Sequence, residues 1–196
     1  MDFKPLPREF YEQDTLELAR HLLGKVLVHI SSEGLTAGMI VETEAYGQRD
    51  PACHASRGMT QRNAAMFGPA GMAYVYLVYG IYYCFNVVSG EEGAGEAVLV
   101  RALEPLEGLD LLHKRRQKVR KLTDLMSGPG KLCVAMAINK GHNNRSLIEK
   151  PLFVAEGETV DRTAVACAPR IGISQATDKE WRYYLKENPY VSRIPK

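Results

Sequence analysis

Two strand-like segments that meet at a single glycine constrain the fold more than any other feature of this chain. Residues Met72–Tyr79 and Ile81–Ser89 are rich in β-branched and aromatic side chains, and Gly80 stands between them. Such a composition favours β-strands, and a glycine at the junction permits a tight turn between them. The segment therefore predicts a β-hairpin that carries Tyr79 at its tip.

Further strand and helix signals place this hairpin in a larger sheet. Strands are expected at Lys25–Ile30, Leu35–Tyr46 and Glu96–Leu103, and as short pieces over the last fifty residues. Helices are expected after Asp14, which begins a capping-box-like sequence, from Pro105 onward, and after the loop 127–131. One helical turn capped by Thr60 is expected to end at Phe67. Because strands and helices do not alternate strictly, this order predicts an α+β fold around an antiparallel sheet.

Length and composition exclude several classes of protein. The chain has 196 residues with no repeat and no linker, which predicts a single domain over residues 1–196. No apolar run approaches the ~20 residues of a membrane span, and the first eight residues resemble neither a signal peptide nor a lipidation site. The four cysteines and five histidines show no metal-ligand spacing, so we expect no metal and no cofactor. Scattered free thiols favour a cytoplasmic protein.

The end of the second predicted strand carries two acidic residues. Alternation along a strand places Glu42 and Glu44 on one face, opposite Val41 and Thr43. Two carboxylates beside the ring of Tyr46 suit a hydrolase with a glutamate general base. The alternative interpretation is a solvated strand face on which the glutamates have no role.

Tyrosines and basic residues concentrate around the hairpin. Five of the ten tyrosines lie between positions 74 and 83; ordinary strand packing explains some of them, whereas a ring at the tip suits a wedge inserted between stacked bases. Arg57, Arg62 and Lys131 are candidates for binding phosphates. Residues 114–121 include six basic residues in eight, for most of which a solvated helix face is the preferred interpretation. With a net charge of +2, any nucleic-acid binding requires charge gathered on one face.

Three polar residues stand in contexts that call for an explanation. His54 lies in a polar loop, where a histidine is more often incidental than functional. Arg101 interrupts an apolar strand, so a buried guanidinium there needs a partner such as a glutamate on a neighbouring strand. Asn86 lies in an apolar aromatic strand and is either a satisfied core amide or a hydrogen-bonding group in a pocket.

Several longer segments resemble one known family. These segments run in order along nearly the whole chain, from about residue 15 to 190, and are VETEAY at 41–46, RNAAMF at 62–67, YVYLVYGIYYCFNV at 74–87, VLVRALEPLEG at 98–108, SGPGKLC at 127–133 and RIGI at 170–173. The sequence is similar to the alkyladenine (3-methylpurine) DNA glycosylases. This resemblance implies a fold built around a curved, open-barrel-like antiparallel sheet with flanking helices and a protruding hairpin.

The resemblance also implies roles for individual residues. Glu44 matches the base that activates the attacking water, and Arg101 and the backbone carbonyl of Ile171 match groups that hold this water. The residues that match the base-binding pocket are Tyr46, His54, Tyr76 and Asn86, with Asn86 against the purine 2-position. The residues that match the inserted wedge and its neighbours are Tyr79, Ile81 and Tyr82. In one departure, the loop from Tyr46 to His54 is a residue shorter than is usual, and Cys53 stands where a small residue is common.

The combined interpretation is a monofunctional DNA glycosylase. Such an enzyme flips alkylated purines (3-methyladenine, 7-methylguanine and, as a further candidate, hypoxanthine) out of duplex DNA and leaves an abasic site. The expected partner is double-stranded DNA with damaged purines, bound by a monomer that lies in the cytoplasm, at the nucleoid in a bacterium. Two other classes stay open: a non-catalytic nucleic-acid-binding module and a small-molecule nucleoside hydrolase.

Overall fold

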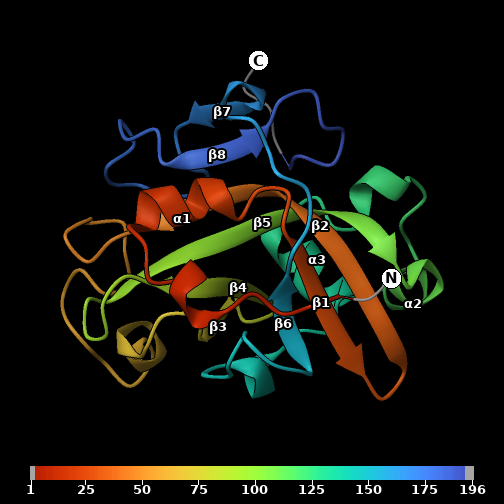
Figure 1. Ribbon diagram of the computed structural model, residues 1–196, viewed down its shortest axis with the longest axis horizontal. Helices are drawn as coiled ribbons and strands as arrows, with labels where there is room; N and C mark the ends of the chain where they lie inside the picture. The colour runs from red at the N-terminus through yellow and green to blue at the C-terminus, as the bar shows by residue number, and fades with distance from the viewer. Residues whose placement is uncertain (1–2, 193–196) are drawn as a thin grey trace.

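One curled antiparallel sheet organises the molecule, as the computed structural model of residues 3–192 shows (Figure 1). Its strands follow the order β3-β4-β5-β2-β1-β6, and β8 pairs with both β2 and β7. The strands are β1 (Val26–Ser31), β2 (Gly34–Tyr46), β3 (Ala73–Val78), β4 (Tyr82–Ser89), β5 (Glu96–Glu107), β6 (Leu152–Ala155), β7 (Val165–Ala168) and β8 (Arg182–Leu185). Strand twist curls such a sheet, and here it forms a half-barrel. The prediction of an α+β fold with an antiparallel sheet is confirmed.

The helices are short and lie on opposite faces of the sheet. Helix α1 (Thr15–His21) lies in front of the sheet in Figure 1, α3 (Pro129–Ala135) lies behind it, and α2 (Leu109–Arg115) flanks one end. The Asp14 carboxylate accepts hydrogen bonds from the backbone N–H groups of Leu16 and Glu17, which confirms the predicted helix start. The 3₁₀ helices are η1 (Arg8–Phe10), η2 (Ala64–Phe67), η3 (Leu122–Asp124), η4 (Lys140–His142) and η5 (Arg162–Ala164).

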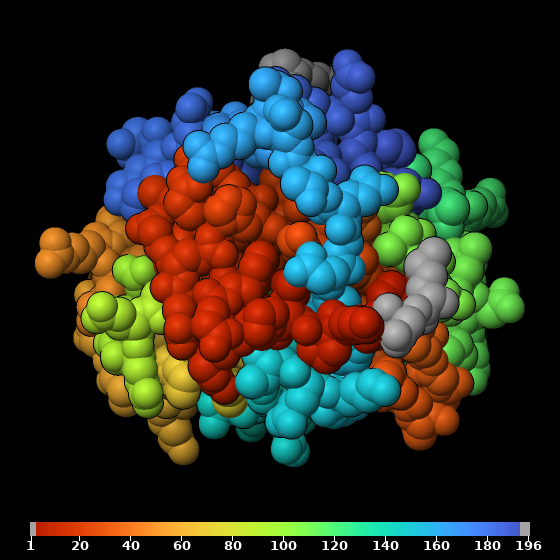
Figure 2. All heavy atoms as spheres, in the orientation of Figure 1, coloured from red at the N-terminus to blue at the C-terminus, as the bar shows by residue number. Residues whose placement is uncertain are grey.

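The main hydrophobic core fills the space between α1, the sheet and α3. Leu18 and Leu22 from the α1 side, Phe85 and Val100 from the sheet, and Leu132 from α3 have no exposed surface. Burial of side chains of this size is worth about 1.5–3 kcal/mol each. Figure 2 shows how the amino-terminal part of the chain (red) covers the middle of the α1 face. The amino-terminal segment and α1 thus cover this side of the sheet.

Three local predictions were wrong. Residues from Pro105 onward continue β5 to Glu107, because Pro105 pairs opposite Gly38 of β2, and the helix begins only at Leu109. Helix α2 then ends at Arg115, so the basic run 114–121 is mostly a turn and not a helix face. Thr60 does not cap a helix; its N–H and hydroxyl donate to the Asn63 side chain instead.

The predicted hairpin is confirmed, and its turn is tight. Strands β3 and β4 pair from Ala73 opposite Val87 to Val78 opposite Tyr82. The N–H of Ile81 donates to the carbonyl of Val78 at 3.2 Å, and Tyr79 and Gly80 have φ angles of 52° and 68°. Two consecutive positive φ angles define the type I′ turn that matches the twist of paired strands. Gly80 adopts this conformation readily, whereas Tyr79 adopts it at a steric cost.

Candidate active site

A row of side chains crosses four strands and forms one wall of the candidate site. The pairing register places Tyr74 of β3 opposite Asn86 of β4, Asn86 opposite Leu99 of β5, and Leu99 opposite Glu44 of β2. Directly opposite residues share a face of an antiparallel sheet. Thr43, the neighbour of Glu44, donates to a carbonyl of α1, so the row lies on the face away from α1. Residues far apart in the sequence thus meet on one surface.

A cavity of about 330 Å³ opens over this surface. Strand residues form its wall together with two loops, one before η2 and one after Ile171. The residues that line it are Tyr46, Pro51, Ala52, His54, Arg62, Met66, Tyr74, Tyr76, Val78, Asn86, Gly172, Ile173, Ser174 and Gln175. This volume suits a small organic ligand.

Aromatic rings dominate the cavity wall. The rings of Tyr74 and Tyr76 lie 5.2 Å apart at 31°, and the His54 ring meets the Tyr76 ring edge-on at 4.6 Å. The Nδ1 atom of His54 is 2.9 Å from the Tyr74 hydroxyl. Burial, and secondarily the charge of Arg62, lower the pKa of His54, so this imidazole is neutral at pH 7. Burial raises the pKa of Tyr74 to about 12 and that of Tyr76 further. The wall therefore offers neutral rings for stacking.

The Glu44 carboxylate lies directly behind this wall and has no exposed surface. Its Oε2 accepts a hydrogen bond from the Tyr46 hydroxyl at 2.8 Å. Its Oε1 accepts one from the backbone N–H of Ile171 at 2.7 Å and lies 3.3 Å from Nη1 of Arg101. Burial, followed by the charge of Glu44, raises the pKa of Tyr46, which keeps its hydroxyl protonated as a donor. Because Tyr46 also lines the cavity, a single side chain connects the buried Glu44 carboxylate to it.

Arg101 joins Glu44 to the second acidic residue of the strand. Its Nε lies 3.1 Å from Oε1 of Glu42, which also lies 3.3 Å from Nη1 of Arg182 and is fully buried. Although burial alone lowers it, the pKa of Arg101 is raised by the carboxylates of Glu44 and Glu42. The alternative of a solvated glutamate face is therefore wrong, and the expected glutamate partner of Arg101 is present. Glu42 does not line the cavity.

Asn86 combines the two interpretations that its sequence context left open. Its Nδ2 donates to the carbonyl of Tyr74 at 2.9 Å, and the side chain is buried. The residue also lines the cavity. The hydrogen bond from Nδ2 to the neighbouring strand fixes the orientation of the Asn86 side chain in the cavity wall.

The hairpin tip presents a contrasting surface. Tyr79 is 84% exposed and Ile81 is 71% exposed, with Tyr82 at 43%. Large apolar side chains with this exposure on a rigid turn mark a contact surface. The structure thus places the three residues predicted as a wedge together at the tip.

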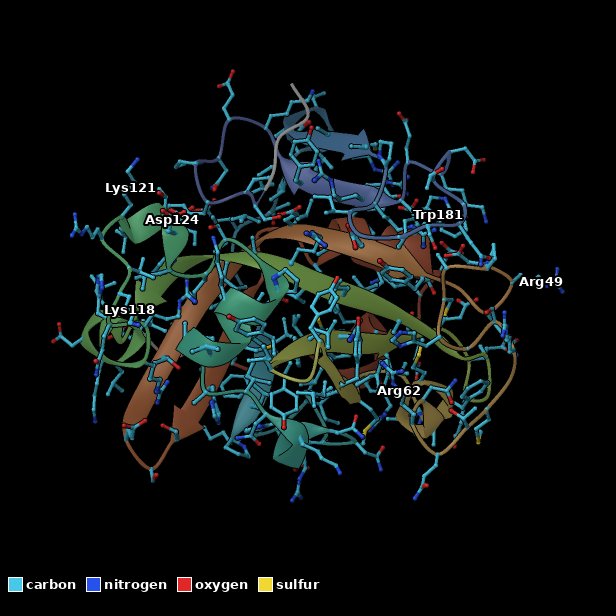
Figure 3. The ribbon with its side chains drawn as sticks, turned by 180° about the vertical axis from the view of Figure 1, so that it is seen from behind. Arg49, Arg62, Lys118, Lys121, Asp124 and Trp181 are labelled. Atoms are coloured by element: carbon cyan, nitrogen blue, oxygen red, sulfur yellow. The ribbon has the colours of Figure 1, made fainter. Side chains whose placement is uncertain are left out.

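The candidate phosphate-binding residues are not equivalent. Arg57 and Arg62 are exposed, and the Arg62 guanidinium lies 5.8 Å from the Tyr76 ring centroid. Lys131 donates to the Ser127 hydroxyl at 3.3 Å and lies 3.8 Å from Asp124. Figure 3, a view from behind, shows Arg62 on one side of the molecule with Arg49 and Trp181, and Lys118 and Lys121 at the opposite end. Arg62 is thus the predicted cation nearest to the cavity aromatics.

Sequence reasoning missed the loop after Arg170. Gly172, Ile173, Ser174 and Gln175 line the cavity, yet only the short RIGI motif drew attention to this region. It also did not anticipate the hydrogen bond from the Ile171 N–H to Glu44. The role of the Ile171 carbonyl in holding a water stays a prediction. The positive φ of 80° at Gly172 allows the chain to turn there, and a glycine in such a motif was the available signal.

The side chains and helices of residues 3–192 bear on metal binding and membrane insertion. No group of three or more His, Cys, Asp or Glu side chains in this part of the chain is arranged to hold a metal ion. Within the same residues, no helix has the length and apolar character needed to cross a membrane.

The aromatic cavity, with a buried carboxylate behind its wall, belongs to a chain that has many known relatives. The chain belongs to the methylpurine-DNA glycosylase family, whose model matches residues 9–189. It is 52% identical over 191 residues to a protein of Methanoculleus marisnigri, covering 96% of this chain and 98% of that one. It is 50% identical over 188 residues to a protein of Prosthecochloris aestuarii, covering 95% and 90%. Both relatives are provisionally named 3-methyladenine DNA glycosylases.

Proposed function

We propose that this protein is a monofunctional DNA glycosylase that excises alkylated purines from duplex DNA. Its substrates would be 3-methyladenine and 7-methylguanine, with hypoxanthine as a further candidate, and its product an abasic site. Membership of the methylpurine-DNA glycosylase family and the names of the relatives support this proposal. The single observation that carries the mechanism is the buried Glu44 carboxylate behind the wall of an aromatic cavity.

Glu44 is the proposed general base. Hydrolysis of a purine N-glycosidic bond forms a sugar with oxocarbenium character and releases the base. A carboxylate can deprotonate the attacking water and stabilise the positive charge on the sugar. Arg101 would orient Glu44 and the water, and the backbone of Ile171 would complete the water site. Alkylation places positive charge on the purine, so such bases leave with little help from an acid.

The cavity is the proposed site of the extruded base. Tyr46, His54 and Tyr76 would stack on the purine, and base–aromatic stacking is worth ~1–3 kcal/mol per base. Their neutral character fits a purine that itself carries positive charge, because a cationic ring is attracted to the face of a tyrosine. Asn86 would contact the purine 2-position. No described residue that lines the cavity is a lysine, which supports hydrolysis by water over attack by an amine.

The hairpin tip is the proposed wedge. Tyr79, with Ile81 and Tyr82 beside it, would enter the duplex where the flipped nucleotide was and hold the base outside the stack. The exposure of these side chains supports this role. Arg57, Arg62 and Lys131 would bind backbone phosphates on either side, and such contacts position a protein on DNA without reading its sequence.

Single-lesion duplexes test the proposal. The wild type should release free base from DNA that contains one alkylated purine and leave an abasic site without cutting the strand. Glu44→Gln keeps the shape of the side chain but removes the carboxylate that acts as general base. Excision should therefore fall by ~10²-fold or more while lesion binding persists. Near-wild-type turnover in Glu44→Gln would refute the role of Glu44.

A parallel assay with free nucleosides separates the other classes. A binding module would release no base from any substrate, and a nucleoside hydrolase would act equally well on free 7-methylguanosine. The proposed enzyme should act on the polymer and leave the nucleoside intact, because the wedge and the phosphate contacts need a duplex.

A further inference from the structure

Arg170 is a buried arginine that contacts Ala45, Tyr46, Asp50 and Trp181 in the surroundings of Glu44. Its side chain and that of its partner Asp50 have no exposed surface. Nη1 of Arg170 donates to the Asp50 carboxylate and, at 2.9 Å, to the carbonyl of Ala45, the residue between Glu44 and Tyr46. Nε and Nη2 have no hydrogen-bond partner. A guanidinium with two unused buried donors costs stability, so its position calls for a reason beyond folding.

The plane of this guanidinium is held against two aromatic rings. Its Cζ lies 4.6 Å from the centroid of the Tyr46 ring and 5.1 Å from that of the Trp181 ring. Arginine stacks on aromatic faces in a way that the ammonium of lysine does not reproduce. Because the Tyr46 hydroxyl donates to Glu44, the contact with Arg170 sets the ring plane from which that donor points.

Arg170 also adjoins the backbone N–H that donates the second hydrogen bond from an uncharged group to Glu44. The next residue along the chain is Ile171, whose N–H donates to Oε1 of Glu44. The ion pair with Asp50 ties this segment to the loop in which Asp50 accepts from the N–H of Ala52, a cavity-lining residue. One guanidinium therefore connects strand β2, both cavity loops and the donors on both carboxylate oxygens.

We propose that Arg170 is the positioning residue of the Glu44 carboxylate, holding the Tyr46 hydroxyl and the Ile171 N–H on its two oxygens. Arg170 does not contact the reacting atoms, and it acts only through Glu44. The inference rests on the proposed function, in which Glu44 is the general base. Loss of Arg170 should therefore impair the chemical step and leave binding of lesion DNA intact.

The variant Arg170→Lys gives the most direct test. Lysine keeps a positive charge for Asp50 but loses the planar group that contacts both rings. Single-turnover excision of 7-methylguanine from a duplex should fall at least tenfold, and the dissociation constant for that duplex should change less than threefold. A carboxylate that loses donors ionises less readily, so the acid limb of the pH–rate profile should move to higher pH. Arg101, Tyr76 and Cys84, which also interact with Glu44, are unchanged in this variant.

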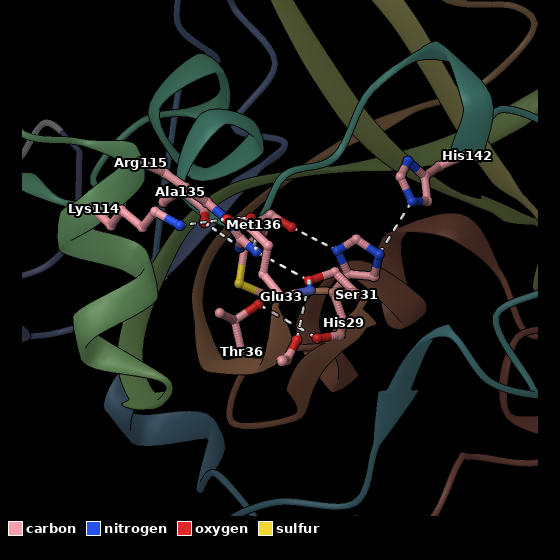
Figure 4. A network of polar contacts seen from close by, with 10 residues as sticks. His29, Ser31, Glu33, Thr36, Lys114, Arg115, Ala135, Met136 and His142 are labelled. Atoms are coloured by element: carbon pink, nitrogen blue, oxygen red, sulfur yellow. Dashed lines mark hydrogen bonds and ion pairs between the residues drawn. The ribbon is translucent and has the colours of Figure 1, made fainter.

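Arg115→Lys is a matched control from the opposite end of the molecule. Arg115 is a largely buried arginine that, like Arg170, contacts one carboxylate and one carbonyl, those of Glu33 and Ala135 (Figure 4). It lies in α2 and does not line the cavity. Arg115→Lys should leave excision and its pH profile unchanged, whatever its effect on the thermal midpoint. This comparison separates positioning from a general loss of stability.

A double-mutant cycle tests whether Arg170 acts through Glu44. In the Glu44→Gln background, Arg170→Lys should cause little further loss of excision, because the group that it positions is already absent. If Arg170→Lys does not fold, Trp181→Leu removes one ring contact, leaves the ion pair intact and should produce the same pH shift with a smaller loss.

The possible failures are distinguishable. Excision within twofold of the wild type and an unchanged acid limb in Arg170→Lys, or in Trp181→Leu if that variant is needed, would overturn the inference, provided that Glu44→Gln is inactive. Full additivity of the two substitutions in the cycle would also overturn it. Wild-type excision by Glu44→Gln would instead reject the proposed function on which the inference rests.

Discussion

The cavity and the hairpin tip, two parts of one proposed site, are built in opposite ways. Behind the cavity wall, Glu44 and Arg101 are buried and paired with groups from distant parts of the chain. At the tip, Tyr79 and Ile81 are exposed, and a single local turn determines their position. Charges in the interior need partners, whereas an exposed wedge needs only a rigid turn to support it. Substitutions behind the cavity should therefore affect stability and chemistry together, and substitutions at the tip should affect function alone.

The largest loss of stability is expected from Glu42→Gln. Glu42 contacts Arg101, Arg182 and the N–H of Ser192, and removal of one partner from a buried charge network is strongly destabilising. The free energy of unfolding, measured by urea titration, should fall by about 3 kcal/mol. Excision by the folded variant at low temperature should fall far less than in Glu44→Gln.

Glu33→Gln provides the control for this experiment. Glu33 pairs with Lys114 and Arg115 at the surface, where ion pairs contribute little. Its unfolding curve should stay close to that of the wild type. If Glu42→Gln were equally harmless, the contrast between the buried and exposed parts of the molecule would be lost.

The second largest effect is expected on selectivity, from Asn86→Ala. Guanine offers the same ring face as hypoxanthine and differs only at the 2-amino group, so stacking alone does not reject it. An edge contact can supply the discrimination. Excision of 7-methylguanine relative to 3-methyladenine should rise about tenfold, equivalent to ~1.4 kcal/mol, and slow removal of normal guanine should appear. A ratio unchanged within twofold would make Asn86 a purely structural amide that holds the Tyr74 carbonyl.

The same contrast explains what could be predicted from the sequence. The hairpin follows from local chemistry, a glycine between two aromatic and β-branched strands, and it was confirmed. The partners of Arg101 were also predictable, because an arginine in an apolar strand needs a carboxylate. In contrast, the sequence predicts a helix from Pro105, and this is wrong because the place of Pro105 opposite Gly38 depends on pairing with a distant strand.

The contacts that Arg170 and Ile171 make around Glu44 could not have been derived from local patterns. Arg170 and Asp50 lie 120 positions apart, and no periodicity connects them. The N–H of Ile171 is a backbone group, which every residue but proline possesses, so residue type carries no information about it. The resemblance to a family pointed to Glu44, Arg101 and Ile171 but not to Arg170 and Asp50. Long-range contacts of this kind are visible only in the folded chain.

At the tip, we expect Tyr79→Asn to separate stability from function. Tyr79 has a positive φ, which asparagine adopts more readily than tyrosine, and Asn-Gly is the preferred pair for a type I′ turn. The variant should be at least as stable as the wild type, with a gain of under ~1 kcal/mol. It should hold the flipped base outside the duplex less well, because the ring is absent. Equal 2-aminopurine fluorescence beside the lesion with the wild type and with Tyr79→Asn would show that Tyr79 does not act as a wedge.

The smallest effects are expected for the phosphate contacts, and they should differ between Arg62 and Lys131. Each phosphate contact contributes about one unit to the slope of log K against log salt concentration. Arg62→Ala should flatten the slope by about one unit for damaged and undamaged duplexes alike. Lys131 is already bound to the Ser127 hydroxyl and lies near Asp124, so Lys131→Ala should change the slope less than Arg62→Ala does. Asp124→Asn would then free Lys131 and steepen the slope. Equal slopes for the wild type and the three variants would mean that neither Arg62 nor Lys131 contacts a DNA phosphate.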